Sequence, residues 1–285
     1  MHSDGAQMTV DSRLVWMPHL DAAGLRQSLD PAGSPSGTAV PKSDSANESR
    51  SLNRYSDGAH DVEIAKLLAT ALLASRGSPL LYFGQEIGMS DAPEPTPMQW
   101  GEAGADKEAF TKGVPWIDMG PNAATANVAF EDADANSLLN WYRKLSALRH
   151  ANPALRSGTM DVIAQSNPDI VAWVRTVPAA ISTTVPVLVV CNVTNRQLLV
   201  SVRADVQELG YETGSGMMHT LASTALSAST AALGPTATDP VTGPVSMSSI
   251  ALPPYGIYIG ELPHQPGLES APSPLRHTSR GKASP

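Results

Sequence analysis

The stretch RGSPLLYFGQEIGM, residues 76–89, constrains the fold of this chain more than any other. Apolar residues recur at helical spacing over residues 61–76, which predicts a helix with Asp61 at its start. Arg76 lies in the last turn, and Gly77 and Pro79 end the helix. The run PLLYFG, residues 79–84, has the length and composition of a strand buried on both faces. Helix, turn and buried strand make half of a β/α repeat, so this region predicts an α/β fold.

The flanking sequence extends this prediction in both directions. RLVWM, residues 13–17, reads as a short strand, and residues 21–30 read as a helix capped by Asp21. Residues 31–49 are rich in Pro, Ser and Gly, so we expect loop or disorder there. A second long helix is predicted over residues 135–150, with Asp134 or Asn136 as its cap.

Residues 90–133 show no sustained period but carry two large aromatic side chains. Trp100 and Trp116 lie in Pro-rich runs. Because large rings in such a loop need burial, we expect them to anchor the loop to the domain.

The pattern changes from about residue 159. Four apolar, β-rich runs are separated by Pro, Asn and Gly: DIVAWVRTV, VPVLVVCNVT, QLLVSVRAD and YGIYIGEL. They predict an antiparallel sheet, in the form of a β-sandwich, with the lone Cys191 in its core. Residues 222–247 read as a long loop or a weak hairpin, and residues 264–285 as a disordered tail.

Composition excludes several function classes for these 285 residues. The net charge is −8 and no basic stripe occurs, so we expect no nucleic-acid partner. No apolar run reaches the ~18 residues of a membrane span. The N-terminal residues lack the pattern of a signal peptide, so a cytoplasmic location is the default expectation. One cysteine and dispersed histidines predict no disulfide and no metal site, and we expect no cofactor.

Several motifs in residues 50–158 occur together in a fixed order. They are RYSDGAHDVEIAKLLATALLASRGSPLLYFGQEIGM, TPMQW, AFTKGVPWI and NSLLNWYRKLSALRHANPALRSG. Together they resemble the C-terminal part of the catalytic domain of glycoside hydrolase family 13. PMQW followed by F…G.PW favours the branch of α-glucosidases, oligo-1,6-glucosidases and trehalose synthases. The β-rich region from residue 159 occupies the place of the small C-terminal sandwich of that family.

The resemblance implies a (β/α)8 barrel followed by a sandwich, and retaining chemistry on α-glucosidic bonds. Such chemistry uses two carboxyl groups about 5–5.5 Å apart. In the family a nucleophilic Asp follows the fourth strand and an acid/base Glu the fifth. A third Asp lies in an Asn-His-Asp motif after the seventh strand.

This chain departs from that pattern at the catalytic positions. PLLYFG matches strand eight, but the residues before it are too few for a barrel of ~200–250 residues. No motif for the nucleophile or the acid/base occurs. By spacing, Ala46 stands for the His and Asn47 for the Asp of the third motif, and an amide cannot supply that negative charge. We therefore predict no catalytic residue in this chain.

Five residues remain as candidate substrate-binding residues by the resemblance. Glu86 and Gln85 follow strand eight, where a bracing role in the loop is the alternative. Arg50 matches a family arginine, but without its Asp partner we expect a solvated charge. Gln99 and Trp100 belong to the TPMQW motif, and Trp100, like Trp116, is an alternative candidate for stacking on sugar rings.

The sequence thus predicts an α/β plus β chain: a remnant of the last units of a (β/α)8 TIM barrel and an antiparallel β-sandwich. The expected divisions are a degenerate segment 1–49, the barrel remnant 50–157, the sandwich 158–263 and the tail 264–285. The expected function is that of a C-terminal fragment of an α-glucosidase-type enzyme, inactive alone. An α-glucan or α-glucoside is the expected ligand, and a separate chain carrying the missing barrel half is a possible partner. The alternatives are a non-catalytic glucan-binding module and a decayed gene product.

Overall fold

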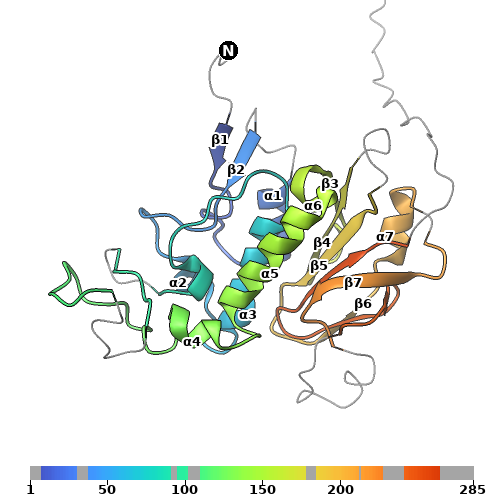
Figure 1. The fold of residues 1–285 in the computed structure, drawn as a ribbon. Helices are drawn as coiled ribbons and strands as arrows, with labels where there is room; N and C mark the ends of the chain where they lie inside the picture. Colours follow the sequence, from blue (N-terminus) through green and yellow to red (C-terminus); the bar gives the residue numbers. More distant parts are fainter. Residues whose placement is uncertain are drawn as a thin grey trace, which may run out of the picture.

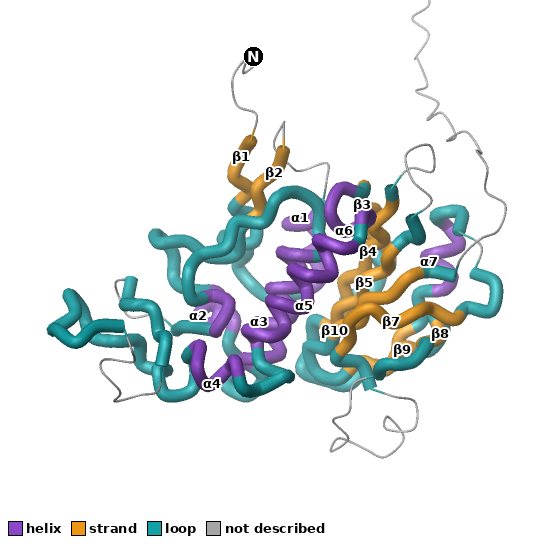
Figure 2. The backbone as a smooth tube through the Cα atoms, viewed as in Figure 1, coloured by secondary structure: helices purple, strands orange, loops and turns teal. Residues whose placement is uncertain are grey.

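The computed structural model describes residues 8–30, 38–90, 95–101, 110–177, 184–211, 213–226 and 241–263. Figure 1 shows the long helices α3 (Asp61–Leu73) and α5 (Leu138–Ala151) beside a large antiparallel sheet. Two short strands, β1 (Met8–Asp11) and β2 (Thr38–Pro41), lie apart from that sheet (Figure 2). The predicted tail 264–285 lies outside the described residues.

The N-terminal strands are parallel and differ from the predicted ones. β1 pairs with β2 in a register that sets Val10 opposite Val40. Residues 13–17 are a turn rather than a strand, because the amides of Val15 and Trp16 both donate to the carbonyl of Ser12. The prediction of loop over 31–49 is wrong at β2, where three apolar residues and Thr38 follow a run of small residues; residues 31–37 lie outside the described part.

The segment PLLYFG is not a full strand, which corrects the expectation for residues 79–84. The amide of Ser78 donates to Ala39 O and that of Leu80 to Pro41 O, both at 2.9 Å, so residues 78–80 run parallel to β2. The chain then turns at Gly84, whose φ is +79°, into the 3₁₀ turn η2 (Gln85–Ile87). The strand-like run is thus cut short by a turn that needs a left-handed residue.

Helices connect these strands at the predicted places. α1 (Ala22–Leu29) begins at Asp21, whose carboxylate accepts from Gly24 N at 2.7 Å. α3 is three residues shorter than predicted, ending before Arg76. α5 is capped by Ser137, whose hydroxyl accepts from Asn140 N, and not by Asp134 or Asn136. Four shorter helices complete the set: α2 (Ser51–Tyr55), α4 (Val128–Asp132), α6 (Pro153–Ser157) and α7 (Arg203–Glu208).

The predicted antiparallel sheet is confirmed, and its strand order is β3-β4-β5-β10-β7-β8. The strands are β3 (Thr159–Ile163), β4 (Ile170–Thr176), β5 (Val187–Asn192), β7 (Met217–Ser223), β8 (Val245–Ser246) and β10 (Ile257–Glu261). A second layer holds the two-stranded ribbon β6 (Leu198–Val200) and β9 (Ile250–Leu252), together with α7. β3 and β7 were not predicted, and SVRAD contributes to α7 rather than continuing a strand.

The central strands are buried on both faces. Trp173 and Val189 point into a cluster shared with α1, α3 and α5, while Ala172 and Val190 point into a cluster under β6, β9 and α7. This explains why β4 and β5 read as continuous apolar runs rather than as alternating ones. Cys191 is buried in the helix-side cluster, as predicted.

Three buried side chains join the helices to the sheet by donating to backbone carbonyls. Arg175 on β4 and Arg149 on α5 both donate to carbonyls at the C-terminal end of α3. Arg26 on α1 donates to Ile170 O at 2.7 Å and to Ala164 O at 3.1 Å. Guanidinium groups at a helix C-terminus satisfy its last carbonyls and complement the helix dipole.

Candidate functional site

The carboxyl ends of β2 and of segment 78–80 place a polar cluster next to one another. Asp44 follows β2 by three residues and is almost fully buried. Its carboxylate accepts from both the amide and the hydroxyl of Ser51 at the start of α2, and Arg54 Nη2 lies 3.6 Å away. Burial raises the pKa of Asp44, while the bonds from Ser51 and the charges of Arg54 and Arg50 oppose that rise. Asp44 is therefore held by the fold at every side.

Arg50 is buried, with 3% of its surface exposed, so the expectation of a solvated charge is wrong. Its Nη1 donates to Phe83 O at 2.8 Å. The guanidinium carbon lies 4.9 Å from the ring centroid of Tyr82 and 5.2 Å from that of Phe83. A carbonyl and two aromatic faces replace the water that the cation loses on burial. Arg50 thus joins the end of β2 to the turn after segment 78–80.

Gln85 and Glu86 lie on η2 but have different surroundings. Gln85 is buried: its Oε1 accepts from Tyr82 N at 2.9 Å, and its Nε2 donates to Tyr142 Oη at 3.0 Å. Gln85 therefore braces the turn against α5. Glu86 is half-buried, and desolvation raises the pKa of its carboxyl, an effect opposed by nearby backbone amides and by Arg50. A carboxyl of raised pKa beside an arginine is the feature here that most resembles a functional group.

Gln99 and Trp100 lie in the loop before α4. Gln99 is fully buried, its Nε2 donating to Ala126 O. Trp100 is 51% exposed and Trp116 is 68% exposed, so the prediction that both rings anchor the loop is wrong. The loop is held instead through its backbone, since the amides of residues 128 and 129 donate to the carbonyls of Gln99 and Trp100. The indole rings are left facing solvent.

The position predicted by spacing to replace the third catalytic Asp lies at the surface. Ala46 and Asn47 are exposed, and the amide of Asn47 donates to Ser45 Oγ at 3.3 Å. Sequence reasoning missed Asp44, the carboxylate that follows β2. The signal was its place three residues beyond a strand, but that strand lay in a stretch read as low-complexity loop.

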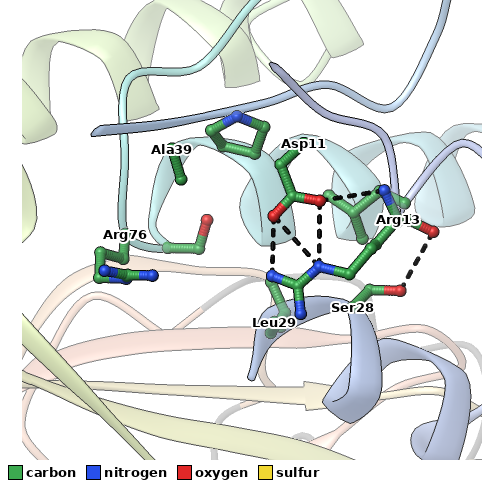
Figure 3. Close-up of a pocket in the computed structure, with 9 residues that line it drawn as sticks. Asp11, Arg13, Ser28, Leu29, Ala39 and Arg76 are labelled. Atoms are coloured by element: carbon green, nitrogen blue, oxygen red, sulfur yellow. Dashed lines mark hydrogen bonds and ion pairs between the residues drawn. The ribbon is translucent and has the colours of Figure 1, made fainter. Parts of the chain in front are cut away.

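A small hollow lies on the helix side of β1 and β2. Figure 3 shows it between the Asp11–Arg13 ion pair, closed at 2.7 Å, and Arg76. Ala39 lines it from β2 and Leu29 from α1. Its volume of ≈ 20 Å³ admits about one water molecule, so it does not accommodate a sugar ring.

The cluster as a whole offers binding chemistry rather than a complete catalytic pair. Glu86 is a candidate acid or hydrogen-bond acceptor, and Arg50 adds positive charge beside it. Asp44 has its oxygens engaged by Ser51 and Arg54, which leaves it poorly placed to act as a nucleophile. In the part of the chain that the structure describes, no group of three His, Cys, Asp or Glu side chains is arranged to hold a metal ion. No helix there is long and apolar enough to cross a membrane.

Comparison with known proteins relates this chain to enzymes of one family. The family model of the α-amylase catalytic domain matches residues 40–158. The oligo-1,6-glucosidase of Parageobacillus thermoglucosidasius is 30% identical over 172 residues, which cover 46% of this chain and 30% of that enzyme. The trehalose synthase/amylase TreS of Mycolicibacterium smegmatis is 35% identical over 127 residues, or 39% of this chain and 21% of that protein.

Solved structures agree at the level of the fold. The trehalulose synthase MutB from Pseudomonas mesoacidophila MX-45 matches with a TM-score of 0.65 and 23% identity, covering 85% of this chain and 47% of that one. A MutB mutant in complex with glucose matches with a TM-score of 0.67. The chain thus spans about a third of the curated relatives and about half of MutB. On these matches, the chain belongs to glycoside hydrolase family 13, the α-amylase family, in its branch of α-glucosidases and trehalose-synthase-like enzymes.

Proposed function

We propose that the chain is the C-terminal part of an α-glucosidase-type enzyme that hydrolyses or transfers α-glucosidic bonds. In this proposal residues 50–157 are the last part of a (β/α)8 barrel and residues 158–263 its C-terminal sandwich. The order of elements supports it: parallel strands alternate with helices up to α5, and antiparallel strands follow. The small parallel sheet reaches back to β1, so the barrel-like part begins before residue 50.

We further propose that the chain alone does not catalyse this reaction. The single observation that carries this is the state of the carboxylates beside Arg50. Asp44 is locked by Ser51 and Arg54, and Asn47 is an exposed amide. Glu86 is then the one carboxyl left for the work, whereas retaining hydrolysis needs two about 5–5.5 Å apart.

A turnover assay on the purified chain tests this. We expect no release of nitrophenol from an aryl α-glucoside, and none of glucose from maltose or isomaltose, above the rate in buffer. Turnover that survives Glu86→Gln would refute the argument from missing carboxylates. Turnover that Glu86→Gln abolishes, while Glu208→Gln on the distant helix α7 preserves it, would reveal an active site built around Glu86.

The proposed ligand of the site is an α-glucoside or an α-glucan chain. Arg50 and Glu86 would contact it, since they share one cluster, whereas Gln85 and Gln99 are committed to internal hydrogen bonds. A separate polypeptide carrying the rest of the barrel is the proposed partner of the chain.

A second candidate function, non-catalytic binding of α-glucan, is favoured by the exposed indoles. Phe110 contacts the ring of Trp116 edge-on at 5.6 Å, which leaves a flat face for a pyranose ring. Retardation on a starch-containing native gel, lost in Trp116→Ala and Trp100→Ala but kept in the equally exposed Trp16→Ala, would establish this function. Retardation that is absent, or equal in all variants, would exclude it. A decayed gene product would show neither binding nor turnover.

A further inference from the structure

The small parallel sheet is covered by helices on one face. Side chains alternate between the faces of a strand, and the register sets Asp11 beside Pro41. These two and Ala39 line the hollow that α1 closes from the other side with Leu29. This face of the sheet, shown in Figure 3, is therefore part of the folded interior.

The opposite face carries apolar side chains that nothing in the described part of the chain covers. Met8 and Val10 alternate with Asp11 and are 59% and 53% exposed. The bond from Ser78 N to Ala39 O sets Ser78 opposite Val40 in a parallel pairing, and Leu80, two residues on, shares that face. Leu80 is 45% exposed. We call Met8, Val10 and Leu80 the open face.

Apolar exposure is concentrated in this part of the molecule. Eleven of the fourteen exposed large hydrophobic side chains among the described residues precede residue 138, and three follow it. The antiparallel sheet, by contrast, is packed on both faces. A soluble protein rarely leaves such a patch bare unless another molecule covers it.

Resting on the proposed function, we propose that the open face docks a separate polypeptide that carries the remaining strands of the α-amylase catalytic fold. Parallel sheets occur almost always with both faces covered, and here one face is bare. β1 is an edge strand, so an added strand extends the sheet from β1 while its side chains pack over Val10.

The extent of the matches identifies the occupant. This chain covers 47% of MutB and 30% of the P. thermoglucosidasius enzyme, so the fold it shares with them continues over a comparable or greater length. The sheet that ends at β1 is the parallel element at which that continuation joins. A second copy of this chain offers the same bare face and the same edge, and does not supply the strands that follow.

The test uses the full chain and, as partner, the portion of MutB outside the part that this chain matches, produced as a separate tagged polypeptide. Val10→Lys and Leu80→Lys place a charge on the open face. Leu199→Lys is the matched control, because Leu199 is an exposed strand residue of β6, at 72% exposure, in the antiparallel part. Light scattering after gel filtration gives the mass of each complex, and titration gives its Kd.

We expect a one-to-one complex for the wild type and for Leu199→Lys, and a Kd at least about tenfold weaker for each open-face variant. Melting curves show that the variants stay folded. The proposal is overturned if the wild type forms no complex, if the open-face variants bind as tightly as the wild type, or if the chain forms a homodimer that Val10→Lys disrupts. Turnover by the complex is scored separately: a complex without activity refutes the proposed function and leaves the docking intact.

Discussion

Replacing Arg175 by methionine tests how the helices are fixed to the sheet. Arg175 is 1% exposed, and its guanidinium donates to four backbone carbonyls. Nε reaches Thr159 O at 3.0 Å, Nη2 reaches Gly158 O at 2.8 Å, and Nη1 reaches both Ala74 O at 3.0 Å and Ser75 O. Burial lowers the pKa of Arg175 to about 9, so the group is still charged at neutral pH.

The cost of Arg175→Met follows from these contacts. Methionine fills much of the space of the arginine stem and donates nothing. Four carbonyls lose a charged donor at about 1 kcal/mol net each, and removing a desolvated charge returns part of that sum. We expect a loss of about 3 kcal/mol in the free energy of unfolding. For a chain of this size that corresponds to a melting temperature lower by roughly 6–12 °C.

Calorimetry or circular dichroism of the full chain measures this shift. The control is Arg143→Met, since Arg143 forms an ion pair with Asp132 in which both side chains are at least half exposed. Such surface pairs contribute less than about 1 kcal/mol. If Arg175→Met melts within 2 °C of the control, a few times less than the shift derived above, the carbonyl cluster does not hold the helices to the sheet.

Two further perturbations have directions fixed by the structure. Gly77 has φ +95°, and a Cβ there would lie 2.5 Å from Ala39 O, so Gly77→Ala should lower stability by about 2 kcal/mol or more, whereas Gly243→Ala, in open space, should change it by less than about 0.5; equal chemical-denaturation midpoints for the two would contradict this. Asp57 accepts from the amides of Ala59 and His60, and its pKa is lowered from 3.8 to about 2 by those bonds and by His60, against a desolvation effect that raises it. A depressed acid pKa gives stability above the unfolded value that is lost as pH falls. The melting temperature of the wild type should therefore approach that of Asp57→Asn between pH 4 and pH 2, and a constant difference over that range would contradict the assignment.

Periodicity predicted the long helices and the central strands because their burial leaves a plain pattern. α3 and α5 have apolar stripes, and β4 and β5 are continuous apolar runs. The ends were less accurate, since Ser137 rather than Asp134 caps α5. β2 was missed because its four residues, TAVP, follow a run of small and polar residues that reads as loop.

The candidate site was predicted in place but not in detail. Sequence motifs indicated Arg50 and Glu86, and the structure places both in one cluster. They gave no sign that Arg50 is buried against Phe83 O, because that contact depends on where the chain turns after Leu80. Asp44 was missed for the same kind of reason: a carboxylate acquires its role from the strand before it, and that strand was not recognised. Exposed indoles at Trp100 and Trp116 are likewise a property of the packing, which local sequence does not encode.

The distribution of buried contacts separates what folds this chain from what the open face does. The antiparallel sheet is packed on both faces, and α1, α3 and α5 are fixed to it through carbonyl-bound arginines. The parallel strands contribute four residues each and bury one face. Folding therefore depends on the sheet, and a charge at Val10 removes no buried contact of the sheet core. A loss of partner binding in Val10→Lys, with an unchanged melt, would then report on docking alone, because the region that holds the fold and the region that is left bare are different parts of the molecule.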